Sequence, residues 1–339
     1  MSPLARISET LIPEDLARFR VELDRGMEPQ NAYLTDVERQ MISGGKKVRP
    51  IVLLLSAHLV CREPDLPEKA VKGAAALEML HVATLIHDDI VDDAGTRRGH
   101  PSVSGARGTK TALLIGDLQF VQALRSFVDA VQVENDMTLV KLVLDTAFEI
   151  CCGELDELDL NVPEDRDERI ARYYKTIDRK TAVLFELAAQ AGVDLGGGRT
   201  HEARRAGFFG RALGRAFQIM DDILDVVETE ASSGKPQGAD LKQGCLSLPV
   251  IYAMEELGED HAIARAARGE IKLEGREHDR ALTDLRASRA IDRAYSAARR
   301  AALEAVFYLK PFRPSAYRNA LEELTMYIVD RPLGGASGA

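Results

Sequence analysis

The chain has 339 residues, of which 45% are hydrophobic and 29% are charged, a composition typical of a folded protein with a buried core. Its net charge of −10 argues against a nucleic-acid binder, because phosphate backbones attract basic surfaces. The four cysteines form no C-x-x-C pair, so we expect free thiols in a reducing cytoplasm. No signal-peptide pattern and no apolar run of about 20 residues is present, so we expect a soluble, cytoplasmic protein without a transmembrane segment.

Apolar residues recur with helical spacing along most of the chain, and no run alternates as a strand would. We therefore expect an all-α fold with a single large helical-bundle domain over residues 1–332, followed by a disordered tail at 333–339. Loops rich in glycine and polar residues fall at 196–198 and 229–240. The predicted helices are, in chain order, 13–28, 31–42, 49–60, 68–92, 109–131, 136–160, 167–191, 202–227, 246–256, 297–309 and 315–329.

The most informative feature is a pair of D-D-x-x-D motifs, at 88–92 and 221–225. Each lies near the C-terminal end of a long apolar helix, and residues four apart share one helix face. The first and last aspartates of each motif therefore project together, at a helix end that disfavours negative charge. A cation between them would offset this cost, and Mg²⁺ is commonly held by one or two carboxylates plus substrate phosphates. One such motif could be a solvated helix end, but two favour a magnesium site.

Basic residues accompany both motifs. Arg97 and Arg98 follow the first motif, Lys235 follows the second, and Lys180 lies on a helix between them. The segment 44–50 adds further cations at a helix N-terminus, which favours anions. Such a set would bind a diphosphate and neutralise the charge that develops as it leaves, while apolar helices exclude water from a carbocation. No P-loop, dinucleotide-binding glycine pattern or Ser-His-Asp arrangement competes with this interpretation.

From about Gly44 to Pro249 the chain resembles the trans-isoprenyl diphosphate synthases of the polyprenyl synthetase family, and among them the long-chain polyprenyl diphosphate synthases. The resemblance implies a helical fold of the isoprenoid synthase type around a central apolar cavity, and a homodimer. It implies Mg²⁺-dependent head-to-tail condensation of isopentenyl diphosphate with an allylic diphosphate. The allylic diphosphate would ionise, the alkene would attack, and the released pyrophosphate would take the proton. The resemblance rests on residues 44–50, 81–89 with 97–99, 116–117, 180–182, and 217–222 with 234–236.

The same resemblance implies a role for each matching residue. The isopentenyl diphosphate site would contain Lys46, Arg49, His81 and Arg98. The magnesium ligands would be Asp88, Asp92 and Asp221. The allylic diphosphate would contact Arg97, Lys180, Thr181, Gln218 and Lys235. The residues expected to carry catalysis are Asp88, Asp89, Asp92, Lys180, Asp221 and Asp222.

Three positions depart from the family pattern. Cys245 stands where relatives often have a lysine, which removes one charge from the set that contacts phosphate. Leu118-Gln119-Phe120 replaces a stretch that is usually rich in aromatic residues, and Glu157 stands where relatives have Gln or Asp. None of these changes removes a main metal ligand, so we expect activity.

Product length in this family is limited by how far an apolar tunnel runs below the first motif. Ala83 and Thr84 lie about one turn before Asp88, and both are small, whereas short-chain enzymes commonly carry bulky aromatics there. Leu80 lies deeper along the same helix. An open floor favours a product longer than geranylgeranyl diphosphate, which could be released to a membrane.

Three alternatives remain. A geranylgeranyl or farnesyl diphosphate synthase would differ only in where the tunnel closes. A class I terpene cyclase usually has a second motif of Asn, Ser and Glu and needs no isopentenyl site. A non-catalytic regulatory subunit would typically lose aspartates from one motif, and both motifs are complete in this chain.

Overall fold

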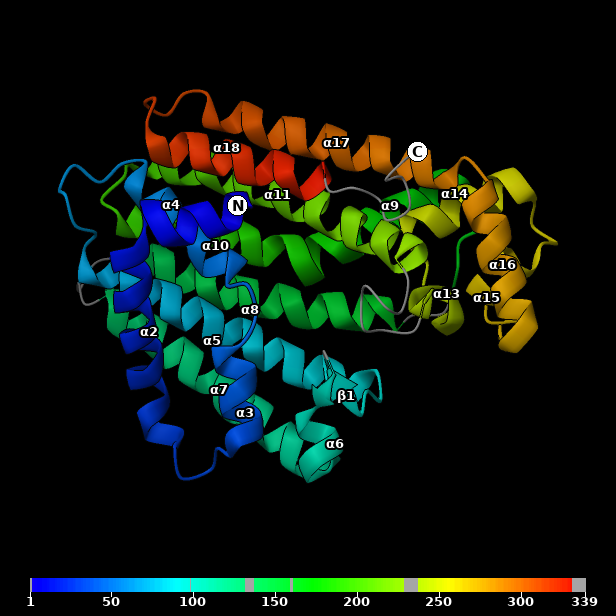
Figure 1. Cartoon of the computed structure of the whole chain (residues 1–339), viewed down its shortest axis with the longest axis horizontal. Helices are drawn as coiled ribbons and strands as arrows, with labels where there is room; N and C mark the ends of the chain where they lie inside the picture. Colours follow the sequence, from blue (N-terminus) through cyan, green and yellow to red (C-terminus); the bar gives the residue numbers. More distant parts are fainter. Residues whose placement is uncertain (1, 98, 132–136, 159–160, 229–236, 331–339) are drawn as a thin grey trace. The chain divides into compact units, whose positions relative to one another are not determined.

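The computed structural model describes residues 2–97, 99–131, 137–158, 161–228 and 237–330. The described residues are mostly helical, and their only strands form one short antiparallel pair, β1 (Thr96–Arg97) with β2 (His100–Pro101). The predicted all-α class is therefore confirmed (Figure 1). The chain divides into two compact units, the first with residues 1–147, 184–210 and 308–324, the second with the remainder. The single domain expected over 1–332 stays a prediction, and the tail expected at 333–339 lies outside the described residues.

The first unit is built around α5 (Glu68–Val91), which is buried on nearly all of its sides. A helix that is apolar all round must be surrounded by other helices. α5 packs against α2 (Pro13–Met27), α4 (Val48–His58) and α7 (Thr109–Val131), and Figure 1 shows α5 and α7 side by side. The unit also contains α1 (Pro3–Arg6), a π-helix (Ile7–Leu11), a 3-10 helix (Glu28–Gln30), α3 (Asp36–Ser43), α6 (Val103–Arg107), most of α10 (Val183–Leu195), and parts of α8 (Met137–Glu157), α11 (Thr200–Val227) and α18 (Ala316–Val329).

The start of α3 differs from the prediction. The helix predicted over 31–42 begins at Asp36, because the backbone N–H and the hydroxyl of Thr35 donate to the Glu38 carboxylate at 2.6 and 2.5 Å. Such a side-chain box stops a helix from extending backwards. Arg107 of α6 donates to the same fully buried carboxylate at 2.5 Å and to the carbonyl of Tyr33 at 3.0 Å. Glu38 therefore ties α6 to the beginning of α3.

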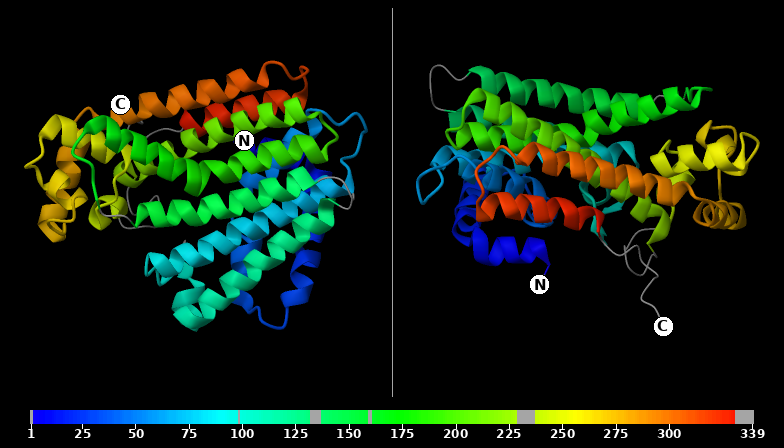
Figure 2. Two further views of the ribbon diagram at one scale, coloured as in Figure 1. Left: turned by 180° about the vertical axis from the view of Figure 1, so that it is seen from behind. Right: turned by 90° about the horizontal axis from the view of Figure 1, so that it is seen from above.

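The second unit holds the rest of the helices. α13 (Ala239–Gln243), α14 (Leu248–Leu257), α15 (Ala262–Ala267) and α16 (Gly275–Ala287) gather into one cluster, seen in yellow to orange in both views of Figure 2. α16 is followed by α17 (Ala290–Leu309), and α14 also packs against α9 (Arg166–Ile177). In the described part of the chain, no helix combines the length and the apolar character needed to cross a bilayer.

One predicted helix is interrupted. The segment predicted as a single helix over 167–191 consists of α9, a π-helical turn η3 (Asp178–Ala182) and α10. A π turn widens the helix by one residue, and such turns occur often at functional sites. The apolar spacing on either side stays helical, so periodicity alone does not reveal the turn.

Glu38→Gln should lower the free energy of unfolding of the first unit by about 2 kcal/mol, the range for hydrogen bonds to charged groups. Burial alone would raise the pKa of Glu38, but the hydrogen bonds from Thr35 and Arg107 outweigh it and hold the pKa below its ordinary value of 4.5. The carboxylate therefore stabilises the fold above that value, and its contribution is lost as the pH falls through the lowered pKa.

Thermal unfolding should thus show a gap between the wild type and Glu38→Gln at about pH 7 that narrows towards about pH 3. Glu14→Gln, at an exposed acid of the same unit, is the control and should show no such gap. Equal losses for the two variants would contradict the assigned role of Glu38.

Candidate functional site

The first acidic motif lies at the C-terminal end of α5, as predicted. Asp88 is half-buried in the last turn, and Asp92 is exposed and caps the helix, donating its N–H to the Asp88 carbonyl at 2.8 Å. The chain then turns sharply at Asp93, whose φ of +52° lies in the left-handed region. Two of the predicted metal ligands therefore lie at a helix end where a cation is favoured.

Asp89, the second aspartate of this motif, is only 2% exposed. Its two carboxylate oxygens accept from Nε of Arg97 at 2.8 and 3.0 Å. Arg97 lies in β1, so this ion pair fastens the loop after α5 back onto the helix. Asp89 therefore holds Arg97, a predicted allylic diphosphate contact, in place.

The predicted isopentenyl residues Arg49 and His81 are in contact, although 32 positions separate them. Nη1 of Arg49 lies 3.0 Å from Nε2 of His81. Because a guanidinium only donates, Nε2 accepts and the ring carries its proton on Nδ1. Lys46 is exposed at the beginning of α4, and Arg98 lies outside the described residues. The first unit thus brings together two of the four predicted residues and leaves Lys46 accessible.

Lys47 has a structural role among these cations. Its Nζ donates to the buried carboxylate of Glu78 on α5 at 2.8 Å, which ties α4 to α5. Its φ of +51° sets the sharp entry into α4. The sequence pattern alone does not separate Lys47 from Lys46 and Arg49.

The Gly116-Asp117 pair receives a physical explanation in α7. A Cβ at Gly116 would lie 2.3 Å from Nε2 of His87, so only glycine leaves room for this ring beside the first motif. The same ring nitrogen lies 3.3 Å from the Asp117 carboxylate. Gly116 and Asp117 therefore position the ring of His87, which directly precedes Asp88.

The second motif lies near the end of α11. Asp221 is exposed, whereas Asp222 is buried and accepts hydrogen bonds from the Tyr173 hydroxyl at 2.6 Å and from Nε2 of Gln218 at 2.8 Å. The hydroxyl of Thr181 donates to Oε1 of Gln218 at 2.7 Å. Burial raises the pKa of Asp222 to about 7, and Asp221 and Asp225 add to the rise while the two hydrogen bonds oppose it. Only Asp221 of this motif presents an exposed carboxylate.

Further carboxylates surround the second motif. Asp225 caps α13, because its oxygens accept from the N–H groups of Ala239 at 3.2 Å and Asp240 at 3.1 Å. Burial raises the pKa of Asp240 well above its ordinary value, and Asp225, Asp222, Asp221 and Glu157 raise it further. This crowding of negative charge is the environment that a divalent cation relieves.

The donor set fits magnesium bound together with a substrate. Among the described residues, no group of three or more His, Cys, Asp or Glu side chains forms a metal site by itself. Magnesium differs from a structural zinc in this respect, since it keeps water and substrate phosphate oxygens in its coordination shell. One or two accessible aspartates per motif, as seen at Asp92 and Asp221, match that preference.

Lys180 lies in η3, and its Nζ is held by the carboxylates of Glu154, at 3.0 Å, and Glu157. Glu157, which departs from the family pattern, therefore contributes to holding a predicted phosphate ligand. Gly153 of α8 lies against the backbone of η3. A Cβ added at Gly153 would lie 2.7 Å from the backbone nitrogen of Lys180. Lys235 lies outside the described residues.

The residues predicted to set product length are all buried in α5. Leu80 and Ala83 are fully buried and Thr84 is 9% exposed, with its hydroxyl donating to the His81 carbonyl at 2.8 Å. These side chains are small or aliphatic, as required by the prediction that no bulky residue closes the tunnel below the first motif, which we call the floor model. The tunnel itself stays a prediction.

Several contributing residues escaped the sequence analysis. Tyr173 lies on the buried stripe of α9 with Arg169 and Ile177, a spacing that indicates ordinary core. Asp240 lies in a stretch that the sequence marks only as a polar loop, and Glu154 is one acid among many on α8. A clue was available for Asp240, because it lies five residues before Cys245, the position at which relatives often have a lysine that contacts phosphate.

A family model for the polyprenyl synthetases matches residues 31–284, which include both acidic motifs. The chain belongs to the polyprenyl synthetase family. The heptaprenyl diphosphate synthase component 2 of Geobacillus stearothermophilus is 32% identical over 95% of this chain and 97% of its own length. The short chain isoprenyl diphosphate synthase of Methanothermobacter thermautotrophicus is 38% identical over 70% of this chain and 72% of its own. Other relatives are named for nonaprenyl and octaprenyl products.

Solved structures agree with this membership. The polyprenyl synthase of Caulobacter crescentus, solved in complex with calcium and isoprenyl diphosphate, matches with a TM-score of 0.83 and 29% identity, covering 97% of each chain. The predicted family, its long-chain branch, its helical fold and the expectation of a prenyltransferase are therefore confirmed.

Gly153→Ala should destabilise this polyprenyl synthetase by about 1–3 kcal/mol, because the new methyl group would push the backbone of η3 away from α8. Chemical denaturation measures the loss. Gly26→Ala is the matched control, since a Cβ there meets no backbone atom but the end of the Met79 side chain and, at 3.8 Å, Oγ of Ser126, and alanine favours the helix. A loss for Gly26→Ala as large as that for Gly153→Ala would contradict the contact assigned to η3.

Proposed function

We propose that this chain is a trans-polyprenyl diphosphate synthase that condenses isopentenyl diphosphate head-to-tail with an allylic diphosphate. The observation that carries the proposal is that the aspartates of both motifs have the same two environments. In each, an aspartate with an accessible carboxylate accompanies a buried second aspartate that holds a donor side chain, Asp89 with Arg97 and Asp222 with Gln218. The family and its relatives support the same activity.

Two sets of residues would each bind one of the two substrates. Lys46, Arg49 and His81, with Arg98, would bind isopentenyl diphosphate. Magnesium, held by Asp88, Asp92 and Asp221, would neutralise charge on the departing diphosphate. Arg97, Lys180 and Lys235 would place fixed positive charge beside the allylic diphosphate, and the uncharged side chains of Gln218 and Thr181 would contact it as hydrogen-bonding groups. Such charges favour the transition state most when they are oriented in advance, as the carboxylate partners of Arg97 and Lys180 ensure.

The reaction conserves atoms and charge. The allylic carbon–oxygen bond breaks and both of its electrons leave with the diphosphate. The alkene of isopentenyl diphosphate then forms the new carbon–carbon bond, and the released diphosphate takes the proton from the resulting cation. The apolar helix α5 next to the first motif would shelter this cation from water.

The product is proposed to be longer than geranylgeranyl diphosphate. Small residues at Ala83 and Thr84 leave the side of α5 without a bulky aromatic floor. A geranylgeranyl or farnesyl product is the second candidate, favoured by the 38% identity to a short chain synthase. The contact between Arg49 and His81 argues against a terpene cyclase, which needs no isopentenyl site, and the two complete motifs argue against a regulatory subunit.

We also propose a homodimer, located in the cytoplasm, that can release its product to a membrane. Leu114, Val121 and Val128 on α7 lie seven residues apart and are 67, 54 and 54% exposed. Apolar residues with this spacing form the seam between paired helices. The relative from Geobacillus stearothermophilus is named as one component of a synthase, so an assembly with a different chain is the alternative.

The purified chain, given isopentenyl diphosphate, farnesyl diphosphate and Mg²⁺, should form elongated products that chromatography separates by length. Chelation by EDTA should abolish turnover, and added Mg²⁺ should restore it. Asp92→Asn should lower kcat by about a hundredfold or more, since it removes a carboxylate expected to act in charge stabilisation.

Asp93→Asn is the matched control for Asp92→Asn. It removes a neighbouring exposed carboxylate, and asparagine tolerates the left-handed backbone at this position. Absence of elongation by the wild type, or turnover that EDTA leaves unchanged, would refute the proposed function.

Thr84→Phe and Ala83→Phe should each shorten the product by one or more isoprene units, because a bulky ring would block the space beside α5. Chromatography of the products measures the chain length, and unfolding curves verify that each variant folds. Val91→Phe, at an exposed position of the same helix, should leave the distribution unchanged. An unaltered product from both buried variants would rule out the floor model.

A further inference from the structure

Thr181 and Gln218, both proposed to contact the allylic diphosphate, begin a chain of hydrogen bonds that runs into the interior of the second unit. The Thr181 hydroxyl donates to Oε1 of Gln218 at 2.7 Å, and Nε2 of Gln218 donates to Asp222 at 2.8 Å. The Tyr173 hydroxyl donates to the other oxygen of Asp222 at 2.6 Å. Tyr173 is 5% exposed, so the chain ends on a buried side chain that has no role in the proposed function so far.

The chemistry of Asp222 sets the direction of this chain. Both of its carboxylate oxygens accept hydrogen bonds, one from Nε2 of Gln218 and the other from the Tyr173 hydroxyl. Gln218 must therefore turn its amide nitrogen towards Asp222 and its oxygen towards Thr181. The single hydroxyl hydrogen of Thr181 is then used on Gln218. The amide of Gln218 has a second hydrogen that the bond to Asp222 does not use, and this hydrogen can reach an anion.

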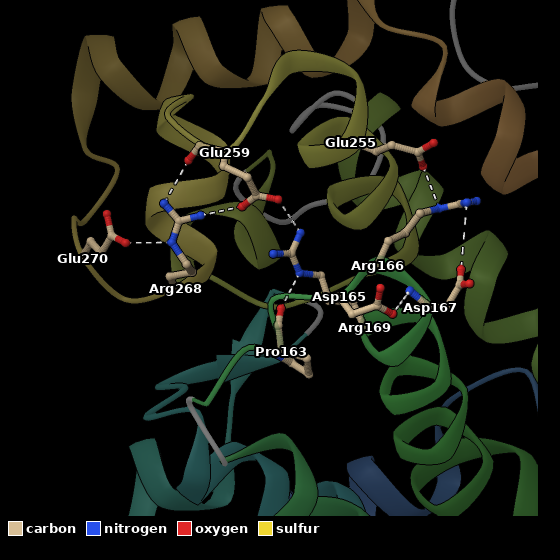
Figure 3. Close-up of polar contacts among 9 residues, drawn as sticks. All are labelled: Pro163, Asp165, Arg166, Asp167, Arg169, Glu255, Glu259, Arg268 and Glu270. Atoms are coloured by element: carbon tan, nitrogen blue, oxygen red, sulfur yellow. Dashed lines mark hydrogen bonds and ion pairs between the residues drawn. The ribbon is translucent and has the colours of Figure 1, made fainter.

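A charged network at the start of α9, the helix that carries Tyr173, is shown in Figure 3. Asp165 caps the helix by accepting from the N–H groups of Asp167 and Glu168 at 2.8 and 3.0 Å. Arg169, itself buried, donates to the Pro163 carbonyl and to Glu259, both at 2.6 Å.

The same network continues from Glu259 to Arg268, again at 2.6 Å, and anchors the segment between α14 and α15 (Figure 3). Tyr173 follows Arg169 by four residues and so lies on the same face of α9. The Arg169 bonds and the bond from the Tyr173 hydroxyl to Asp222 therefore come from one face of α9.

We propose that Tyr173 is a positioning residue for prenyl transfer, acting through Asp222 to turn the Gln218 amide so that its nitrogen donates to the allylic diphosphate. Thr181 has a matching role, because it holds the amide oxygen and does not itself donate to the diphosphate. An amide turned the other way would face the anion with its carbonyl oxygen and repel it. This inference rests on the proposed function, replaces the direct contact of Thr181 with the diphosphate by an indirect one through Gln218, and adds a residue and a direction.

Tyr173→Phe removes the hydroxyl and keeps the ring. It should raise KM for farnesyl diphosphate about tenfold, the loss expected for a hydrogen bond to a charged group, and change KM for isopentenyl diphosphate by less than about twofold. Tyr174→Phe removes the neighbouring hydroxyl as the matched control and should change neither constant. Arg49→Lys, at the proposed isopentenyl site, is the opposite control and should raise KM for isopentenyl diphosphate selectively.

A double-mutant cycle separates positioning from general stabilisation. In a Gln218→Ala background, Tyr173→Phe should have no further effect on KM for farnesyl diphosphate, because the amide that it orients is absent. Thr181→Ser should behave as wild type and Thr181→Val as Tyr173→Phe. An additive effect of Tyr173→Phe in that background, or a lowered melting temperature with both KM values unchanged, would overturn the proposal.

A binding measurement tests the role of Tyr173 separately from the proposed function. Calorimetric titration with farnesyl thiodiphosphate and Mg²⁺ requires no turnover. Weaker binding by Tyr173→Phe than by wild type and Tyr174→Phe supports the positioning role, and equal affinities refute it, whatever the elongation assay shows. A wild type that binds the analogue but forms no elongated product would refute the proposed function alone.

Discussion

The placement of carboxylates at the ends of apolar helices is the constraint on which the rest of this site depends. α5 and α11 end in two D-D-x-x-D motifs, so acidic groups meet both the negative end of a helix dipole and the edge of a dry core. The protein compensates the inner acids one by one. Arg97 pairs with Asp89, Tyr173 and Gln218 donate to Asp222, and the start of α13 donates to Asp225.

The cations of the site are likewise paired with side chains of opposite charge. Lys180 is held by Glu154 and Glu157, and Lys47 by Glu78. A buried or half-buried charge without a partner would cost several kcal/mol, so pairing within each unit lets the chain fold before any substrate arrives. Each acid that holds a cation cancels the charge of that cation in the total, so the net charge of −10 does not reveal these local cations. An anionic substrate can therefore find a local set of cations in a strongly acidic chain.

Much of this could be predicted from the sequence, and the failures have physical causes. The long helices and the two motifs follow from spacing, and the assignment of Arg49 and His81 to one site follows from the family resemblance. Tyr173 could not be predicted, since a tyrosine on a buried stripe looks the same whether its hydroxyl reaches a carboxylate or not. The start of α3 was misplaced because Thr35 and Glu38 form a box whose geometry outweighs the apolar spacing before it. Direct partners such as Asp89 and Arg97 depend on tertiary contacts that periodicity does not contain.

Three local departures from regular backbone lie at or beside residues that are predicted to bind substrate or metal. Among the described residues, the two non-glycine positions with positive φ are Lys47, between Lys46 and Arg49, and Asp93, directly after Asp92. The π-helical turn η3 contains Lys180 and Thr181. Such conformations cost energy and persist only where the surrounding packing imposes them. Glu78 fixes the side chain of Lys47, Gly153 admits the backbone of η3, and the ion pair of Asp89 with Arg97 closes the turn after Asp93. The directions of the ligands are therefore properties of the packed units, which explains why a motif specifies the chemistry of this site but not its geometry.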